Sequence, residues 1–185
     1  MLRVAARKLF TTDMPKLPPK QELDKFRPSS KTSAFEQMEK NEDGQISLKL
    51  KTKIKISSDT YIFRFEFPDP EFCLGLPVGN HVMFHAKVGG EDILRKYTPI
   101  SEVKDQTFVD FVIKVYRKNV HPKFPEGGLM TQYLEGLKLG ESVRMSGPHG
   151  RITYEGCGRF STKKKVMEKK KIGHIAGGTG ITPIY

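Results

Sequence analysis

Arg95-Lys96-Tyr97-Thr98-Pro99-Ile100-Ser101 gathers a fixed cation, a phenol, two hydroxyls and a proline into seven residues, straight after a short strand-like run. A buried core strand does not need this mixture. A guanidinium pairs with phosphate oxygens, a tyrosine ring can lie beside a flat ring system, and hydroxyls donate and accept hydrogen bonds. The stretch therefore predicts a surface that holds a flat aromatic ligand together with a diphosphate. By itself it also fits an edge strand with an exposed Arg and Tyr.

Segments with strand periodicity lie on both sides of this stretch. Apolar and polar residues alternate from 46 to 56, which predicts that Ile54 and Ile56 share the buried face with the apolar residues before them. Further strands are predicted at 61–67, 81–88, 93–97, 108–116 and 142–145, the last turning at 147–150 into 152–154. Short antiparallel strands at this spacing predict a mainly β fold, a six-stranded barrel.

One helix is predicted across the open end of this barrel. Its apolar residues recur at i, i+3, i+4 and i+7 and form one stripe: Met130, Tyr133, Leu134 and Leu137. Gly127-Gly128 stands at the helix start, where small residues let a ligand approach free N–H groups that favour anions. Thr131 adds a hydroxyl in the first turn. An ordinary helix start after a Gly-Gly turn has the same pattern.

The composition restricts the class of protein. The chain has 185 residues, 37% hydrophobic and 29% charged, which is typical of a folded domain, and its apolar runs are too short to span a membrane. Its net charge is +11, but the lysine clusters at 49–55 and 163–171 are not interleaved with stacking aromatics. We therefore predict no nucleic-acid partner. The clusters fit a solvated face or, alternatively, a surface that attracts an acidic protein.

The two ends of the chain differ in character from the middle. Residues 1–12 carry Arg3, Arg7 and Lys8 and no acid, which predicts a mitochondrial targeting segment, with an untargeted basic terminus as the alternative. The polar, proline-marked stretch up to 43 reads as an extended arm, with a short helix near 33–40. The predicted domains are therefore this targeting-like segment and arm at 1–43, the barrel at 44–160, and a Lys-rich linker at 161–171.

The final segment, 172–185, has the pattern of a nucleotide-binding unit. A short apolar strand is predicted at 172–176, followed by Gly177-Gly178-Thr179-Gly180-Ile181-Thr182-Pro183, a glycine-rich turn into a helix. A lone parallel strand cannot bury both of its faces. The sequence therefore predicts the start of a truncated α/β domain whose remainder is not in this chain.

These features, in this order, resemble the NADH–cytochrome b5 reductase family of ferredoxin-reductase-type flavoproteins. The resemblance covers about residues 46–183 and is carried by seven stretches: Leu76 to Gly79, Arg95 to Ser101, Val112 to Tyr116, His121 to Pro125, Gly127 to Leu134, Ser146 to Pro148 and Ile175 to Pro183. It implies a six-stranded antiparallel Greek-key barrel that holds FAD, with one capping helix, followed in the family by an α/β domain that holds NADH.

The resemblance also implies cofactor-binding roles for individual residues. Arg95 would bind the FAD diphosphate, and Tyr97 and Thr98 would line the isoalloxazine. Thr179 and Thr182 would approach the flavin from the last segment. No catalytic residue is assigned; Thr98 and Lys114 are the candidates on the flavin and nicotinamide sides.

Further residues would complete this site. Val112, Lys114 and Tyr116 share one face of their strand and would lie along the flavin, and the segment that ends at Phe124 would lie near the adenosine half. The helix start would hold the diphosphate: Gly128, Met130 and Thr131.

Two departures from the family pattern stand out. Leu129 occupies a position where the family commonly has a cation, and the Cys-Gly-Pro-type nicotinamide motif is absent from the sequence. The NADH site is therefore predicted to be incomplete. No metal site is predicted, because His81 and His85 share a strand face without a third ligand.

Two functions remain as hypotheses. The first is an FAD-binding, reductase-like electron-transfer protein that cannot oxidise NADH alone, so that its status as an enzyme stays open. The second is a non-catalytic accessory subunit of a larger mitochondrial assembly, with an acidic or haem-bearing protein as partner. The two are not exclusive, since a subunit can hold FAD without turnover.

Overall fold

The computed structural model describes residues 33–69, 71–101 and 107–185. The predicted targeting segment and most of the predicted arm lie outside these residues. The arm's short helix lies within them as α2 (Ala34–Lys40), with the Ser33 hydroxyl accepting a hydrogen bond from the Phe35 N–H as its N-cap. Its buried side chains, Ala34, Phe35 and Met38, pack against β1 and β6.

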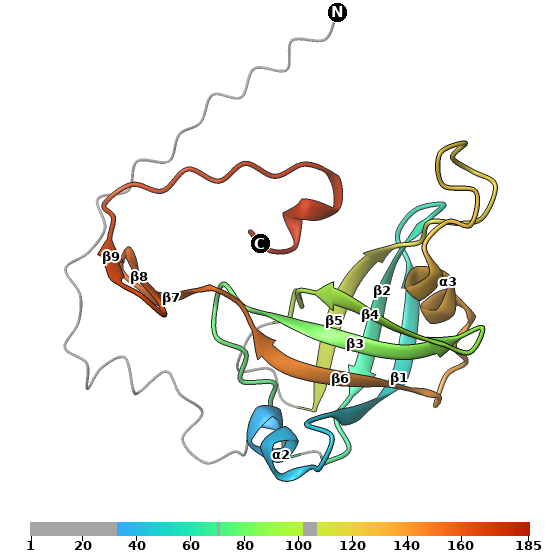
Figure 1. The fold of residues 1–185 in the computed structure, drawn as a ribbon, viewed down its shortest axis with the longest axis horizontal. Coiled ribbons are helices and arrows are strands. Elements are labelled where there is room, and N and C mark those ends of the chain that lie inside the picture. The colour runs from blue at the N-terminus through green and yellow to red at the C-terminus, as the bar shows by residue number, and fades with distance from the viewer. Residues whose placement is uncertain (1–32, 70, 102–106) are drawn as a thin grey trace, which may run out of the picture.

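Six antiparallel strands form one curled sheet (Figure 1). They are β1 (Ile46–Lys55), β2 (Thr60–Glu66), β3 (His81–Val88), β4 (Glu91–Tyr97), β5 (Phe108–Lys114) and β6 (Ser142–His149). Their order is β4-β3-β6-β1-β2-β5, so β6 inserts between the hairpin β3–β4 and the hairpin β1–β2. The predicted mainly β, six-stranded antiparallel fold is confirmed. In the described part of the chain, the edge strands β4 and β5 do not pair, and the sheet is a half-barrel.

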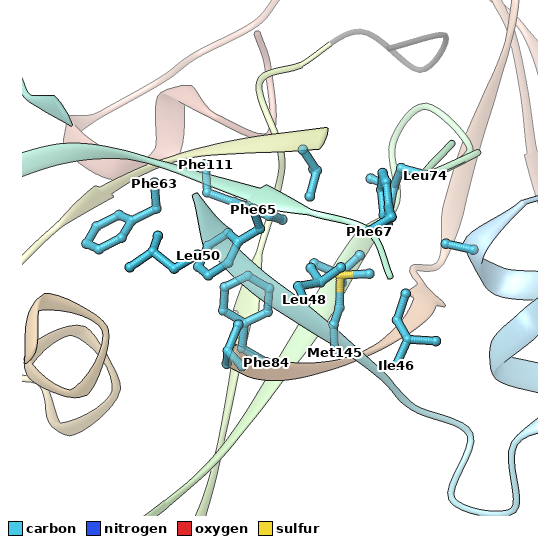
Figure 2. Packing of buried hydrophobic residues seen from close by; sticks show 14 of the residues in the cluster. Ile46, Leu48, Leu50, Phe63, Phe65, Phe67, Leu74, Phe84, Phe111 and Met145 are labelled. Atoms are coloured by element: carbon cyan, nitrogen blue, oxygen red, sulfur yellow. The ribbon is translucent and has the colours of Figure 1, made fainter. Parts of the chain in front are cut away.

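The inner face of the sheet buries a cluster of phenylalanines (Figure 2). The Phe65 ring packs edge-on against Phe84, with centroids 5.6 Å apart, and against Phe111 at 6.2 Å. Phe63, Phe65, Phe84 and Phe111 are fully buried, together with Leu48, Leu50 and Met145. The alternation read from the sequence places these residues inward because side chains on a strand have a period of two.

A β-bulge in β1 overturns one expectation. The pairing with β2 shifts between Leu50 and Thr52, so Lys51 is an extra residue. A one-residue shift moves every later side chain to the other face. Ile54 and Ile56 are therefore 53% and 54% exposed rather than buried, and Lys53 faces Phe63 with its Nζ 5.8 Å from the ring centroid.

The predicted capping helix is α3 (Leu129–Gly136), which contacts β3 and β4. Met130, Leu134 and Leu137 are buried, and Tyr133 packs against the core. The apolar stripe thus closes one end of the half-barrel, while α2 lies at the other (Figure 1).

The C-terminal third departs from the prediction in two places. Residues 152–154 do not join the barrel: β7 (Ile152–Gly156) pairs with β8 (Arg159–Thr162), and β8 with β9 (Val166–Glu168), in a separate three-stranded sheet. Part of the predicted Lys-rich linker is therefore strand. Residues 172–176 form no strand and are exposed, and a 3-10 helix, η2 (Gly178–Ile181), follows. The physical reason is that this segment has no neighbouring strand to pair with.

Candidate functional site

A cavity of about 480 Å³ opens between the unpaired edges of β4 and β5, beside the start of α3. It brings together predicted site residues from four separate segments of the chain: Arg95, Tyr97, Thr98, Val112, Lys114, Tyr116, Gly128, Met130, Thr131, Thr179 and Thr182. Of the predicted site residues, only Phe124 is not in this lining. The gap between the sheet edges is therefore the place where the predicted site assembles.

The β4 side of the cavity combines a cation that forms no ion pair with described residues and a half-buried phenol. The Arg95 guanidinium donates to the Leu94 carbonyl at 2.7 Å and has no acidic partner in the described part of the chain. The Tyr97 ring packs on Phe84 with centroids 4.9 Å apart. Burial raises the pKa of the Tyr97 phenol above its ordinary value, so the hydroxyl stays protonated and remains a donor.

The β5 side carries a paired lysine. Val112, Lys114 and Tyr116, for which the resemblance implied a place along the flavin, line the cavity together with Ile113. The Lys114 ammonium lies 3.1 Å from the Asp59 carboxylate, and this contact is the main cause that lowers the pKa of Asp59. The charge of Lys114 is thus partly balanced within the chain, unlike that of Arg95.

The start of α3 is attached directly to the end of β5. The Gly128 N–H donates to the Tyr116 carbonyl at 2.8 Å, the Tyr116 N–H donates to Thr131 Oγ1 at 3.2 Å, and that hydroxyl donates to the Gly128 carbonyl at 2.9 Å. No side chain caps the helix, which leaves first-turn N–H groups without an intrahelical partner. This helix start therefore offers donors and a positive dipole end to an anion.

A second cavity, of about 570 Å³, continues from the first. The two share Lys114, Tyr116 and Gly128 in their linings. Phe124, which is 65% exposed, lines the second cavity, and its ring lies 5.3 Å from that of His121. Because they share these lining residues, the two cavities form one continuous trough.

Some lining residues were missed by sequence reasoning. Asn80, His81 and Lys96 contribute to the first cavity. Asn80 donates to Thr153 Oγ1 at 2.9 Å, and burial is the main cause that lowers the pKa of His81. Their place follows from the β3–β4 register, in which Val82 lies opposite Tyr97 and His81 therefore falls beside the end of β4. The place of Asn80 and His81 in the lining could therefore be predicted only by someone who already knew the β3–β4 register.

The described residues form no second constellation with an evident chemistry. No group of three His, Cys, Asp or Glu side chains is placed to hold a metal. His85 instead shares a hydrogen bond with Ser146, at 2.7 Å. Neither Cys73, which is buried, nor Cys157, which is half-buried, is in a disulfide within the described part of the chain. In the part of the chain that the structure describes, no helix is both long and apolar enough to cross a membrane.

The lining fits a flavin dinucleotide. A cation without an acidic partner and an uncapped helix start suit a diphosphate, and Tyr97, Val112 and Met130 offer flat or apolar surface. A Cβ at Gly128 would lie 2.6 Å from Thr131 Oγ1, so a larger residue there would displace the hydroxyl that links the helix start to Tyr116. An antiparallel half-barrel with this site at its open edge defines a flavin-binding domain of the ferredoxin-reductase type.

Comparison with known proteins gives the family. The model of the oxidoreductase FAD-binding domain matches residues 47–154. The chain belongs to this family of FAD-binding domains, and FAD is confirmed as the predicted cofactor.

Individual relatives agree with this assignment. NADH-cytochrome b5 reductase 2 of Homo sapiens is 49% identical over 148 residues, which are 77% of this chain and 54% of the relative. Nitrate reductase [NADH] 2 of Phaseolus vulgaris is 50% identical over 141 residues, 76% of this chain and 16% of the relative. The crystal structure of the cytochrome b5 reductase domain of Ulva prolifera nitrate reductase has a TM-score of 0.73 at 44% identity, covering 78% of this chain and 55% of that one.

The predicted resemblance is therefore confirmed. This chain spans about half the length of the cytochrome b5 reductases that it matches.

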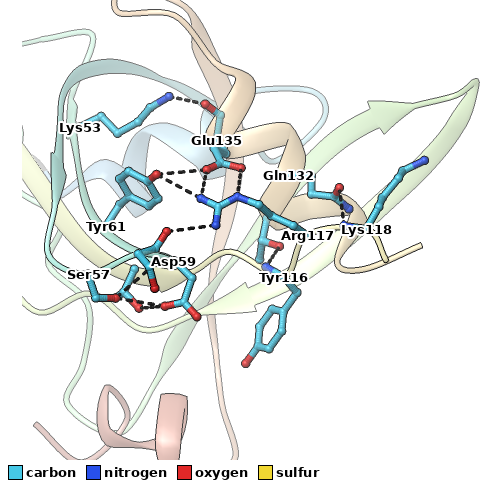
Figure 3. A network of polar contacts seen from close by, with 12 residues as sticks. Lys53, Ser57, Asp59, Tyr61, Tyr116, Arg117, Lys118, Gln132 and Glu135 are labelled. Atoms are coloured by element: carbon cyan, nitrogen blue, oxygen red, sulfur yellow. Dashed lines mark hydrogen bonds and ion pairs between the residues drawn. The ribbon is translucent and has the colours of Figure 1, made fainter. Parts of the chain in front are cut away.

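A polar network beside the trough gives a pH-dependent prediction (Figure 3). The pKa of the Glu135 carboxyl lies below the ordinary 4.5, mainly because Glu135 accepts a hydrogen bond from Arg117. The Tyr61 hydroxyl adds to this lowering, and burial opposes it. A carboxyl whose pKa is lower in the folded state stabilises the fold above its ordinary pKa and loses that contribution as pH falls through the folded-state value.

We expect Glu135→Gln to lower the free energy of unfolding at neutral pH, and the difference from the unchanged protein to shrink as the pH is taken well below 4.5. Urea unfolding at a series of pH values measures it. Glu126→Gln is the control, because its side chain is 71% exposed and such carboxylates contribute little. A difference that grows as the pH falls would contradict the assignment.

Proposed function

We propose that this chain is the flavin-binding half of an electron-transfer protein of the NADH–cytochrome b5 reductase type, with FAD in the trough. The observation that carries the proposal is the cavity at the β4–β5 gap, because it gathers residues from four distant segments into one lining. If the Arg95–Ser101 stretch were only an exposed strand end, these other segments would have no reason to meet beside it.

Each part of the trough has a proposed role. Arg95 and the start of α3, with Gly128, Met130 and Thr131, hold the diphosphate. Tyr97 and Thr98 lie along the flavin from one sheet edge. The flavin is lined from the other edge by Val112, Lys114 and Tyr116, near the adenosine half by Phe124, and from the C-terminal segment by Thr179 and Thr182.

When bound, FAD would supply the redox chemistry, since a flavin can accept a hydride and release single electrons. The chain's own residues bind it, orient it and exclude water from it. The Tyr97 phenol, whose pKa is raised further by burial, is protonated and available as a hydrogen-bond donor to the ligand. Arg95 brings the fixed positive charge that the diphosphate requires.

We further propose that a polypeptide of these 185 residues does not oxidise NADH alone. It spans about half the length of its reductase relatives, and its sequence holds no Cys-Gly-Pro nicotinamide motif. NADH-dependent bleaching of the flavin absorbance by this polypeptide would disprove this part.

The flavin absorption spectrum of the purified protein, followed by titration of the apoprotein with FAD, tests the main proposal. We expect Arg95→Met to weaken FAD binding by about 10- to 100-fold, because charged hydrogen bonds contribute about 1.5–3 kcal/mol. Arg144→Met, an exposed change on β6 outside the cavity linings, is the matched control and is expected to bind FAD normally. A colourless protein that FAD does not reconstitute would disprove the proposal.

A second candidate, an accessory subunit of a larger assembly, is favoured by the charge. The net charge of +11 and the exposed lysines at 163–165 and 169–171 suit an acidic partner, such as an acidic haem protein. Native electrophoresis of the tagged protein in cell extract, with and without added salt, tests this candidate. Migration as a monomer under both conditions counts against it.

Mitochondrial targeting is a proposal that rests on the acid-free, Arg-bearing residues 1–12. A fluorescent reporter fused after residue 32 tests it, with Arg3→Glu and Arg7→Glu as the control. Diffuse fluorescence of the unchanged fusion would refute the proposal.

A further inference from the structure

Arg117 joins three elements around the trough (Figure 3). It follows Tyr116 immediately in the chain. Its guanidinium donates two hydrogen bonds to the Glu135 carboxylate on α3, from Nη2 to Oε1 and from Nε to Oε2 at 3.3 Å. The same Nη2 reaches the Tyr61 hydroxyl on β2 at 3.2 Å, and Nη1 donates to the Ser58 carbonyl at 3.0 Å. Tyr61 in turn donates to Glu135 at 3.2 Å. The end of β5, the start of β2 and the last turn of α3 are thus tied at one point.

Lys53 ties the same end of α3 to β1. Its ammonium donates to the carbonyls of Glu135 and of Leu137, the latter at 2.9 Å. Carbonyls at a helix C-terminus lack intrahelical partners and favour a cation. Lys53 reaches them because the bulge in β1 turns it toward Phe63.

The other end of α3 is the anion-binding start. It is attached to Tyr116 through Gly128 and Thr131, so consecutive residues, Tyr116 and Arg117, contact opposite ends of one helix. An isolated helix of eight residues is not stable, and its position is set by its tertiary contacts. A change at either attachment is therefore transmitted to the free N–H groups of the first turn.

We propose that Arg117 is a positioning residue: by pairing with Glu135 it fixes α3 against the end of β5 and so holds the helix start in the arrangement that binds the FAD diphosphate. This inference rests on the proposed FAD-binding function. Arg117 belongs to the lining of the second cavity, but its guanidinium is engaged by Glu135, Tyr61 and the Ser58 carbonyl, so the proposed action is through the helix. The side chains of Arg117 and Glu135 are 39% and 27% exposed, so breaking the pair is expected to lower the free energy of unfolding only modestly, with the larger effect on FAD binding.

The experiment measures FAD affinity by fluorescence titration of the folded apoprotein, together with urea unfolding. We expect Arg117→Met and Glu135→Gln each to weaken FAD binding about fivefold, and the double variant to be no weaker than either single one, because the two residues act as one unit. Arg117→Lys is expected to restore only part of the affinity, since an ammonium cannot engage the carboxylate with a fork.

Arg64→Met is the matched control. Arg64 forms a comparable bidentate pair with Asp110, at 2.8 and 2.7 Å, and its side chain is also 39% exposed, but it lies on β2 outside the cavity linings. We expect this variant to lose stability and to keep its FAD affinity. Unchanged affinity in Arg117→Met, or an equal loss in Arg64→Met, overturns the proposal.

Hydrogen exchange of residues 129–136, measured without FAD, separates this proposal from the function on which it rests. We expect faster exchange there in Arg117→Met and not in Arg64→Met. If the unchanged chain fails to bind FAD, the proposed function is wrong, and the exchange data still decide whether Arg117 fixes α3. Equal exchange in all three proteins overturns the positioning role.

Discussion

Phe65→Ala is expected to lower the free energy of unfolding by about 3–5 kcal/mol, which is a large part of the stability of a single domain. Phe65 is fully buried, and its ring contacts those of Phe63, Phe84 and Phe111 at centroid distances of 6.4, 5.6 and 6.2 Å. Truncation removes the ring's burial and leaves a cavity that stiff aromatic neighbours cannot fill. Urea unfolding followed by circular dichroism measures the loss.

Phe124→Ala is the control for the aromatic change itself. The Phe124 side chain is 65% exposed, so the same truncation without FAD present is expected to alter stability by no more than about 0.5 kcal/mol. Similar losses in the two variants would mean that the phenylalanine cluster is not the centre of the core.

Gly127→Ala is expected to weaken FAD binding at least about tenfold and to destabilise the fold by about 1–3 kcal/mol. Gly127 has φ +66°, and a Cβ there would lie 2.4 Å from the Tyr116 carbonyl oxygen and 2.8 Å from the Arg117 carbonyl carbon. Both neighbours are backbone atoms, so the start of α3 must move away from β5. FAD titration and urea unfolding measure the two effects.

Gly136→Ala is the matched control at the other end of the same helix. Nothing lies within 4 Å of a Cβ at Gly136, and this residue has no positive φ. We expect a gain of a few tenths to about 1 kcal/mol, because alanine favours helix more than glycine does, and unchanged FAD affinity. A Gly127→Ala protein that behaves like Gly136→Ala would show that α3 does not need its close approach to β5.

The strands could be predicted from the sequence because their signal is local. Alternation over 61–67 and 108–116 and the stripe through Met130 and Leu134 specify which side is buried, and the structure agrees. The bulge at Lys51 could not be predicted from the alternation of β1, in which Thr52 is the one polar residue at an otherwise apolar position. Its effect, exposing Ile54 and turning Lys53 inward, depends on the pairing with β2, which is a non-local property.

The residues of the candidate site also fall into those that the sequence could predict and those that only the structure shows. The residues that carry a strong chemical signature, such as Arg95 and Tyr97, were predicted, and the structure lines one cavity with them. Asn80 and His81 were missed because only the β3–β4 register brings them beside β4. The Arg117–Glu135 pair was missed because its partners are 18 residues apart and on different elements.

By itself, the sequence determined the element types of the half-barrel and of α3, the inward faces of most strands, the family and the residue types available to a diphosphate and a flat ring. These follow from side-chain chemistry and from periodicities of two and 3.6 residues. Only the tertiary structure decided that the β4 and β5 edges stay apart and hold the site between them, that 152–168 forms a sheet of its own, and how α3 is fixed. These depend on contacts between distant segments, whose geometry no local pattern encodes.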